Sequence, residues 1–141
     1  MADLTVTAAN VLLISGTPFP DQRAGVAISQ GDAVYQADDG TWLKAKASGT
    51  DREAGYNNYG IALSSAANVG GRLSVAGPGC TVALGVGAVG VVYVISATAG
   101  KIAPVADLVS TNRLTVLGVG IASNRIVIPP GSNYVAGAVL P

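Results

Sequence analysis

The stretch that decides the fold is GCTVALGVGAVGVVYVISATAG, residues 79–100, which contains no charged side chain. About 20 apolar residues in a helix can cross a membrane, so the length of this stretch alone permits a membrane span. However, three glycines interrupt its centre, and its segment 91–95 is rich in β-branched residues, which favour strands over helices. The flanking Lys or Arg and the interfacial aromatic residues of membrane helices are missing. We therefore predict two buried strands joined by a glycine turn, and no membrane association.

Turn-forming residues recur at short intervals along the rest of the chain, as in ADDG (37–40), ANVGG (67–71) and PPG (129–131). The segments between them are short and strand-like. In TWLKAKA (41–47) the side chains alternate, so that Trp42, Lys44 and Lys46 share one face and the remaining residues share the other. No window predicts an amphipathic helix of useful length. This spacing predicts an all-β fold, a β-sandwich or jelly-roll-like barrel.

An internal similarity supports hairpins. Residues 83–95 and 116–128 share Leu-Gly-Val-Gly, followed at the same offset by a strand that ends in Val-Ile, and residues 60–75 have a similar outline. Repeated patterns of this kind are expected of repeated supersecondary units. We therefore expect each segment to form a strand, a turn and a second strand.

The chain of 141 residues predicts a single domain. Within it we expect an N-terminal strand and extended arm over residues 1–23, a β-sandwich core over 24–128 and an apolar C-terminal tail over 129–141. Terminal segments fray unless something holds them. An apolar tail is more plausibly held against a neighbouring subunit than left in water.

Charge is the most informative feature of the composition. Eight basic and eight acidic residues cancel, and only 11% of the chain is charged, compared with about 25% in a typical soluble domain. Without net positive charge or a Lys/Arg cluster, electrostatic capture of nucleic acid is not expected. A domain with so few charges would expose apolar patches if it stood alone, and such patches indicate a surface that binds a partner. We expect other protein to cover much of the surface.

The residues needed for catalysis are largely missing. The chain has no histidine, which removes the usual general base and the commonest metal ligand. GVGAVG (85–90), with Asp107 beyond it, matches a dinucleotide fingerprint, but strand-like rather than helical sequence follows, so we interpret the glycines as turns. The carboxylates of 38–53 lack the ligand spacing of a calcium loop, and Asp-Gly is a standard hairpin turn. We expect no enzymatic activity, no cofactor and no metal site.

Three further features concern the cysteine, the N-terminus and the aromatic residues. Cys80, the only cysteine, is expected to be a small buried hydrophobe, with an intermolecular bond as the alternative. The N-terminus lacks the pattern of a secretory signal, so we expect synthesis in the cytoplasm.

Trp42 either meets a partner beside Lys44 or fills a second covered face of the sandwich. Tyr56 and Tyr59 in GYNNYG suit an interface, a sugar site or a plain ordered loop.

Four segments follow one another along the chain: GDAVYQADDGTWLKAKAS (31–48), GIALSSAANVGGRLSVAGPGCTVALG (60–85), VVYVISATAGKIAPVADL (91–108) and LTVLGVGIAS (114–123). Taken in this order, they resemble the small capsid cement, or head decoration, proteins of tailed bacteriophages. None of them is a catalytic motif. The resemblance implies a β-sandwich or jelly-roll-like barrel that binds the outside of an icosahedral capsid between capsomers and resists the pressure of packaged DNA.

The resemblance also implies a virion protein made in the host cytoplasm, whose partner is the phage major capsid protein. Family members form dimers or trimers; we expect a homodimer on local two-fold axes, because that symmetry is the commonest, with a trimer as the alternative. A carbohydrate-binding or adhesin-like β domain is the alternative function. The residues expected at interfaces lie at the two ends of the chain and in its two polar hairpins: Leu12, Leu13, Ile14, Phe19, Trp42, Lys44, Tyr56, Tyr59, Tyr134, Val135 and Leu140.

Overall fold

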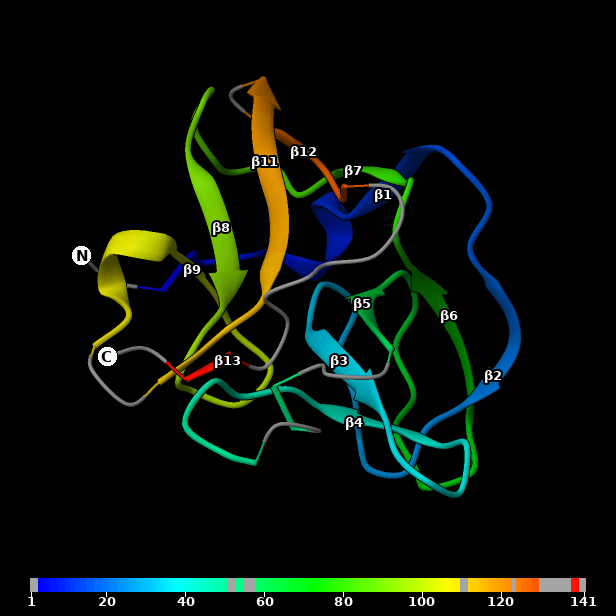
Figure 1. Ribbon diagram of the computed structural model, residues 1–141. Helices are drawn as coiled ribbons and strands as arrows, with labels where there is room; N and C mark the ends of the chain where they lie inside the picture. Colours follow the sequence, from blue (N-terminus) through cyan, green and yellow to red (C-terminus); the bar gives the residue numbers. More distant parts are fainter. Residues whose placement is uncertain are drawn as a thin grey trace.

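The computed structural model describes residues 3–50, 53–54, 58–109, 112–122, 124–129 and 138–139 (Figure 1). These residues form antiparallel strands and two short 3₁₀ helices, η1 (Ala8–Asn10) and η2 (Val105–Asp107). No helix among them is both long and apolar enough to cross a membrane. The prediction of an all-β fold is confirmed.

The larger sheet has six strands, all antiparallel to their neighbours. In spatial order they are β1 (Leu12–Ser15), β7 (Thr81–Ala83), β12 (Arg125–Val127), β11 (Val116–Ala122), β8 (Val92–Ile95) and β9 (Ile102–Pro104). Figure 1 shows this sheet in the upper and left part of the molecule. The stretch that raised the membrane question supplies β7 and β8, joined by a loop in which Gly85, Gly87 and Gly90 have positive φ.

The hairpin prediction is only partly correct. Residues 60–75 fold as β5 (Tyr59–Ala62) paired with β6 (Arg72–Ala76), and residues 116–128 contain the β11 and β12 pair. In contrast, β7 and β8 do not pair with each other, because β12 and β11 lie between them. The similarity between 83–95 and 116–128 therefore reflects similar strands, not two similar hairpins.

The smaller sheet has five strands and curls back on itself. Its order is β2 (Phe19–Arg23), β6, β5, β3 (Ala33–Gln36) and β4 (Trp42–Lys44), and all neighbours are antiparallel. Ala24, just after β2, forms a parallel bridge with Trp42, and the Gly25 amide donates to the Trp42 carbonyl at 2.8 Å. In an antiparallel sheet with an odd number of strands, the first and last strands run in the same direction, so they can meet only through a parallel contact. This bridge therefore brings the first and last strands of the sheet together.

Strand β3, near the middle of the curled sheet, is buried on both faces. Along β3, Ala33 and Tyr35 belong to a first core shared with the six-stranded sheet, whereas Val34 points into a second core. The second core consists of residues from the five-stranded sheet and its adjoining loops, including Trp42, Leu73 and Val75. Alternation along a strand sends successive side chains to opposite faces. On β3 both faces are covered, so Ala33, Val34 and Tyr35 are all apolar or aromatic and buried.

The strand expected within residues 1–23 is present as β1, and the residues before it pack against the first core. The Leu4 amide donates to the Ile102 carbonyl at 2.8 Å, and Leu4 and Val6 pack against the first core. Strands β1 and β2 then join the six-stranded and the five-stranded sheet in turn. At the other end, β13 (Ala138–Val139) pairs with β10 (Arg113–Leu114), and the rest of the expected tail beyond Pro129 lies outside the described residues.

Candidate functional site

The outer face of the six-stranded sheet is the principal candidate site. Leu13, Val82 and Ile126 lie side by side on β1, β7 and β12 and point into the first core. Their neighbours along each strand point the opposite way, since successive side chains alternate. The outer face, as we use the term, consists of Leu12, Ile14, Thr81, Ala83, Val92, Val119, Ile121, Arg125 and Val127.

This outer face is apolar and open. Leu12, Ile121 and Ile14 are 63%, 49% and 38% exposed, and most of the other members are half-buried. Arg125 is its one charged residue among the strands that the structure describes. Apolar side chains scattered singly over a surface need no explanation, whereas several exposed aliphatic side chains on one sheet face make a candidate interaction surface.

The open region ends on strand β8. Val94 and Val116 lie opposite each other on the same side of the sheet as Val92, and Val94 is wholly buried. The exposed members of the outer face lie on β1, β11 and β12.

Two of the expected interface residues, Leu12 and Ile14, belong to this face. Leu13 lies between them and packs instead against the first core. The remaining members on β11 and β12, such as Ile121 and Val127, were not predicted. Their strands were expected from VLGVGIA and RIVI, but these are apolar at nearly every position, so the sequence does not show which side chains face inward.

The expectation that Trp42 meets a partner is wrong. Its side chain is wholly buried in the second core, where its ring lies 5.4 Å from that of Phe19, centroid to centroid. The indole Nε1 donates to Gln22 Oε1 at 2.8 Å, so its one polar group is satisfied within the chain. The alternative, a second covered face, is what the structure has. Phe19 is half-buried by the same contact.

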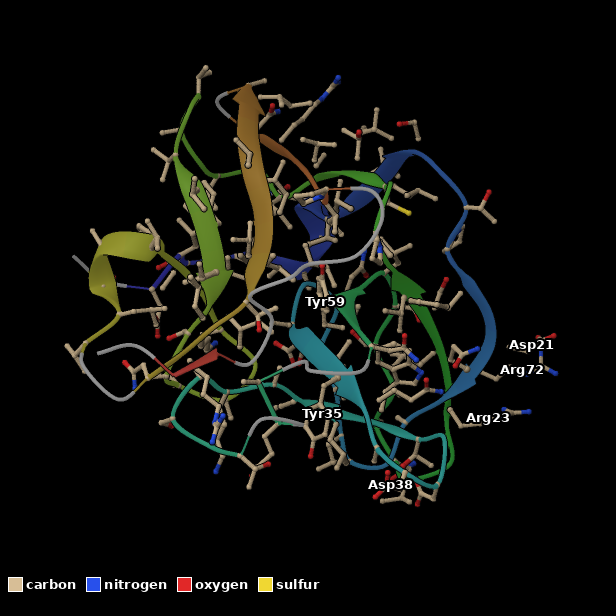
Figure 2. All side chains as sticks on the ribbon, viewed as in Figure 1. Asp21, Arg23, Tyr35, Asp38, Tyr59 and Arg72 are labelled. Carbon is tan, nitrogen blue, oxygen red and sulfur yellow. The ribbon has the colours of Figure 1, made fainter. Side chains whose placement is uncertain are left out.

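Tyr59 is also buried, because it is the first residue of β5 and not part of an exposed loop. It lies directly opposite Tyr35 across β5 and β3, and both belong to the first core. Figure 2 labels both tyrosines, toward the middle of the molecule. Lys44 is the one predicted residue of its hairpin that stays exposed, and its Nζ lies 3.9 Å from Asp32 Oδ2. Tyr56, Tyr134, Val135 and Leu140 lie outside the described residues.

A second surface feature is a groove of about 460 Å³ beside β2 and β6. Phe19 and Leu73 supply apolar lining, and Asp21 and Arg72 supply charge. Arg23 lies directly opposite Arg72 across the two strands, and Figure 2 shows the three charged residues at one edge of the molecule. The groove thus combines apolar side chains with both signs of charge, and no sequence pattern predicted it.

The other candidate motifs have structural roles. GVGAVG is followed by strand β8 and not by a helix, which confirms its interpretation as glycine turns. In the 37–40 turn, Asp39 accepts hydrogen bonds from the Thr41 amide at 3.0 Å and the Thr41 hydroxyl at 2.6 Å. These bonds lower the pKa of the Asp39 carboxyl. Within the described ranges, no three His, Cys, Asp or Glu side chains gather closely enough to hold a metal ion.

Cys80 is a buried residue at the start of β7, as expected from its apolar surroundings. Desolvation raises the pKa of its thiol, which disfavours the reactive thiolate. The Sγ–H group donates to the Thr17 carbonyl oxygen at 3.6 Å. A buried, protonated thiol of this kind contributes to core packing and is not a reactive site.

A scan against protein-family models, a search of curated proteins and a search of solved structures each found no match.

Proposed function

We propose that this chain is a structural virion protein of a tailed bacteriophage. It binds the outer surface of the icosahedral capsid between capsomers and stabilises the shell against the pressure of the packaged DNA. Its partners are the major capsid protein and further copies of itself. The four segments that resemble head decoration proteins support this proposal, and the apolar outer face of the six-stranded sheet is the single structural observation that carries it.

The outer face suits attachment to a protein lattice. A surface with one charged residue and several exposed aliphatic side chains gains free energy when water is removed from it, at roughly 25 cal/mol per Å² of apolar area. A protein that binds the assembled shell more tightly than free coat protein shifts the equilibrium toward the shell. Because few charges take part, such binding should depend little on ionic strength.

The compact double core fits the same role. Strands of both sheets pack around the first core, and the five-stranded sheet encloses the second. A small protein that must keep its shape on an expanding shell benefits from such close packing, because packed interiors have low compressibility. The outer face is thereby presented on strands rather than on loops.

The alternative of a carbohydrate-binding domain is less well supported. That proposal relied on Trp42, Tyr56 and Tyr59 as stacking surfaces for sugars. Trp42 and Tyr59 are buried, so neither can stack against a ligand in the folded protein. A sugar site would have to be built without them.

The test is cosedimentation of the purified protein with empty capsids assembled from the coat protein encoded in the same genome. We expect saturable binding that persists at about 0.5 M NaCl, because apolar contacts are not screened. Ile121→Lys places a charge on the outer face and should weaken binding by more than tenfold. Val69→Lys is the matched control, because Val69 is 74% exposed in the loop between β5 and β6 of the other sheet.

Cryo-electron microscopy of the saturated capsids then shows where the protein sits. Density between capsomers on the outside of the shell supports the proposal. Absence of binding, density only at the tail, or equal binding by Ile121→Lys and the parent chain would overturn it. A glycan array probed with the same protein decides the alternative.

A further inference from the structure

We infer that strand β1 is a contact between two copies of this chain, in which the two β1 strands pair antiparallel across a two-fold axis. The two six-stranded sheets would then join edge to edge into one continuous sheet. This inference names a surface for the self-association that the proposed function includes, and it is argued from the strand edges of the fold alone.

The other edges of the two large sheets are protected. Strand β9 ends in Pro104, and the Ile102 carbonyl on this strand accepts a hydrogen bond from the Leu4 amide. The edges of the five-stranded sheet meet through the bridge between Ala24 and Trp42. Proline, a covering segment and closure of the sheet are the means by which proteins prevent unwanted strand pairing.

Among the described residues, strand β1 has no proline and no covering segment, and its edge protections are its short length and its bulge. Its sequence, Leu-Leu-Ile-Ser, contains no charge and no proline. Among the described residues, β7 is its only strand partner, and no other backbone hydrogen bond involves residues 12–15. The register shifts between Leu13 and Ser15, so Ile14 has no counterpart on β7. The residue left over at such a bulge keeps its backbone groups unpaired. The unpaired backbone groups of this edge are available to a further strand.

A second copy of β1 fits this edge in both backbone and side chains. In antiparallel pairing centred on Leu13, Leu12 of each copy lies opposite Ile14 of the other. Both side chains belong to the outer face, and directly opposed aliphatic side chains stabilise a sheet. A two-fold contact requires a surface that is complementary to itself, which this arrangement provides. The outer faces of the two copies would form one larger apolar surface.

The first experiment is sedimentation equilibrium of the full chain at concentrations up to about 0.1 mM. We expect a dimer. Leu12→Lys and Ile14→Lys should each raise the dissociation constant at least tenfold, because each places an unpaired charge against an apolar partner. Val69→Lys should leave the dimer unchanged, and circular dichroism shows whether each variant is folded.

The second experiment does not depend on lysine being tolerated in β1. In a Cys80→Ala background, the double variant Leu12→Cys and Ile14→Cys should form intermolecular disulfides under mild oxidation, and Val69→Cys should not. A parent chain that stays monomeric would overturn the inference. A dimer that tolerates both lysines, or cysteines in β1 that cross-link no faster than the cysteine at position 69, would overturn it as well. Capsid binding is measured separately, so either proposal can fail alone.

Discussion

The aromatic rings of Phe19 and Trp42 contact each other across the closure of the five-stranded sheet, with centroids 5.4 Å apart and planes inclined by 44°. Phe19 lies on β2 and Trp42 on β4, the two strands at opposite ends of the sheet order. The pair therefore fills the interior where the curled sheet meets itself. Gln22, also on β2, accepts the hydrogen bond of the Trp42 indole.

We expect Trp42→Ala to lower the free energy of unfolding by about 3–5 kcal/mol, because it leaves a large cavity in the second core. Trp42→Phe should cost less, since the ring contact with Phe19 is retained. Urea denaturation followed by circular dichroism measures both. In the parent chain, indole emission should be blue-shifted and poorly quenched by acrylamide. Emission typical of a solvated indole would contradict the burial of Trp42.

Gly120→Ala should destabilise the fold by about 1–3 kcal/mol. The loop between β7 and β8 crosses β11 at this residue: the Gly90 amide donates to the Gly120 carbonyl, and the Gly120 amide donates to the Val91 carbonyl. A Cβ on Gly120 would lie 1.8 Å from the Ala88 carbonyl oxygen, so the loop would have to move. Val119→Ala, on the outer face, is the control and should cost less. Equal unfolding midpoints for Gly120→Ala and the parent chain would contradict this crossing.

The pKa of the Asp39 carboxyl should lie below the ordinary value of 3.8 for an aspartate, because the Thr41 hydroxyl and amide stabilise the carboxylate. A carboxyl whose pKa is lower in the folded than in the unfolded state adds stability above the unfolded pKa, and this contribution is lost as pH falls through the folded value. Thr41→Val removes the hydroxyl and should raise the pKa of Asp39. Carboxyl chemical shifts followed by NMR from pH 2 to 6 measure it. An unchanged pKa in the variant would exclude the hydroxyl as the main cause.

Cys80 should react slowly with an aromatic disulfide reagent in the folded protein and rapidly in denaturant. Its thiol is buried and its pKa is raised by desolvation, so little thiolate is present and access is blocked. The raised pKa also makes the free energy of unfolding depend on pH. Above the pKa of the unfolded thiol, the unfolded state ionises first, so stability should decrease as pH rises from there toward the folded pKa. Fast reaction of the native thiol would contradict both statements.

Deletion of residues 1–16 should destabilise the whole fold. It removes β1, the Leu4 hydrogen bond to β9 and the packing of Leu4 and Val6 on the first core. The paired substitution Leu4→Ala and Val6→Ala should lower the free energy of unfolding by a smaller amount, about 1–4 kcal/mol in total, because these side chains are only partly buried. Thermal unfolding followed by circular dichroism measures each variant. A truncated chain with an unchanged melting temperature would restore the view of these residues as a detachable arm.

Local signals in the sequence determined where strands and turns lie. DAVYQ, ADDG and TWLK became β3, a turn and β4, and the glycines of 85–90 became a loop. These predictions hold because alternation and turn chemistry act over a few residues. The burial of Cys80 and, within the described residues, the lack of a long helix followed from the same kind of reasoning.

Tertiary structure alone decided which strands pair and what covers each face. The sequence placed Trp42 beside Lys44 on one face of a strand, but it could not show that the sheet would curl around that face and bury Trp42. It likewise could not show that β12 and β11 would separate β7 from β8, which is what creates the outer face. Alternation distinguishes the two faces of a strand, but only contacts between residues distant in sequence determine what lies against each.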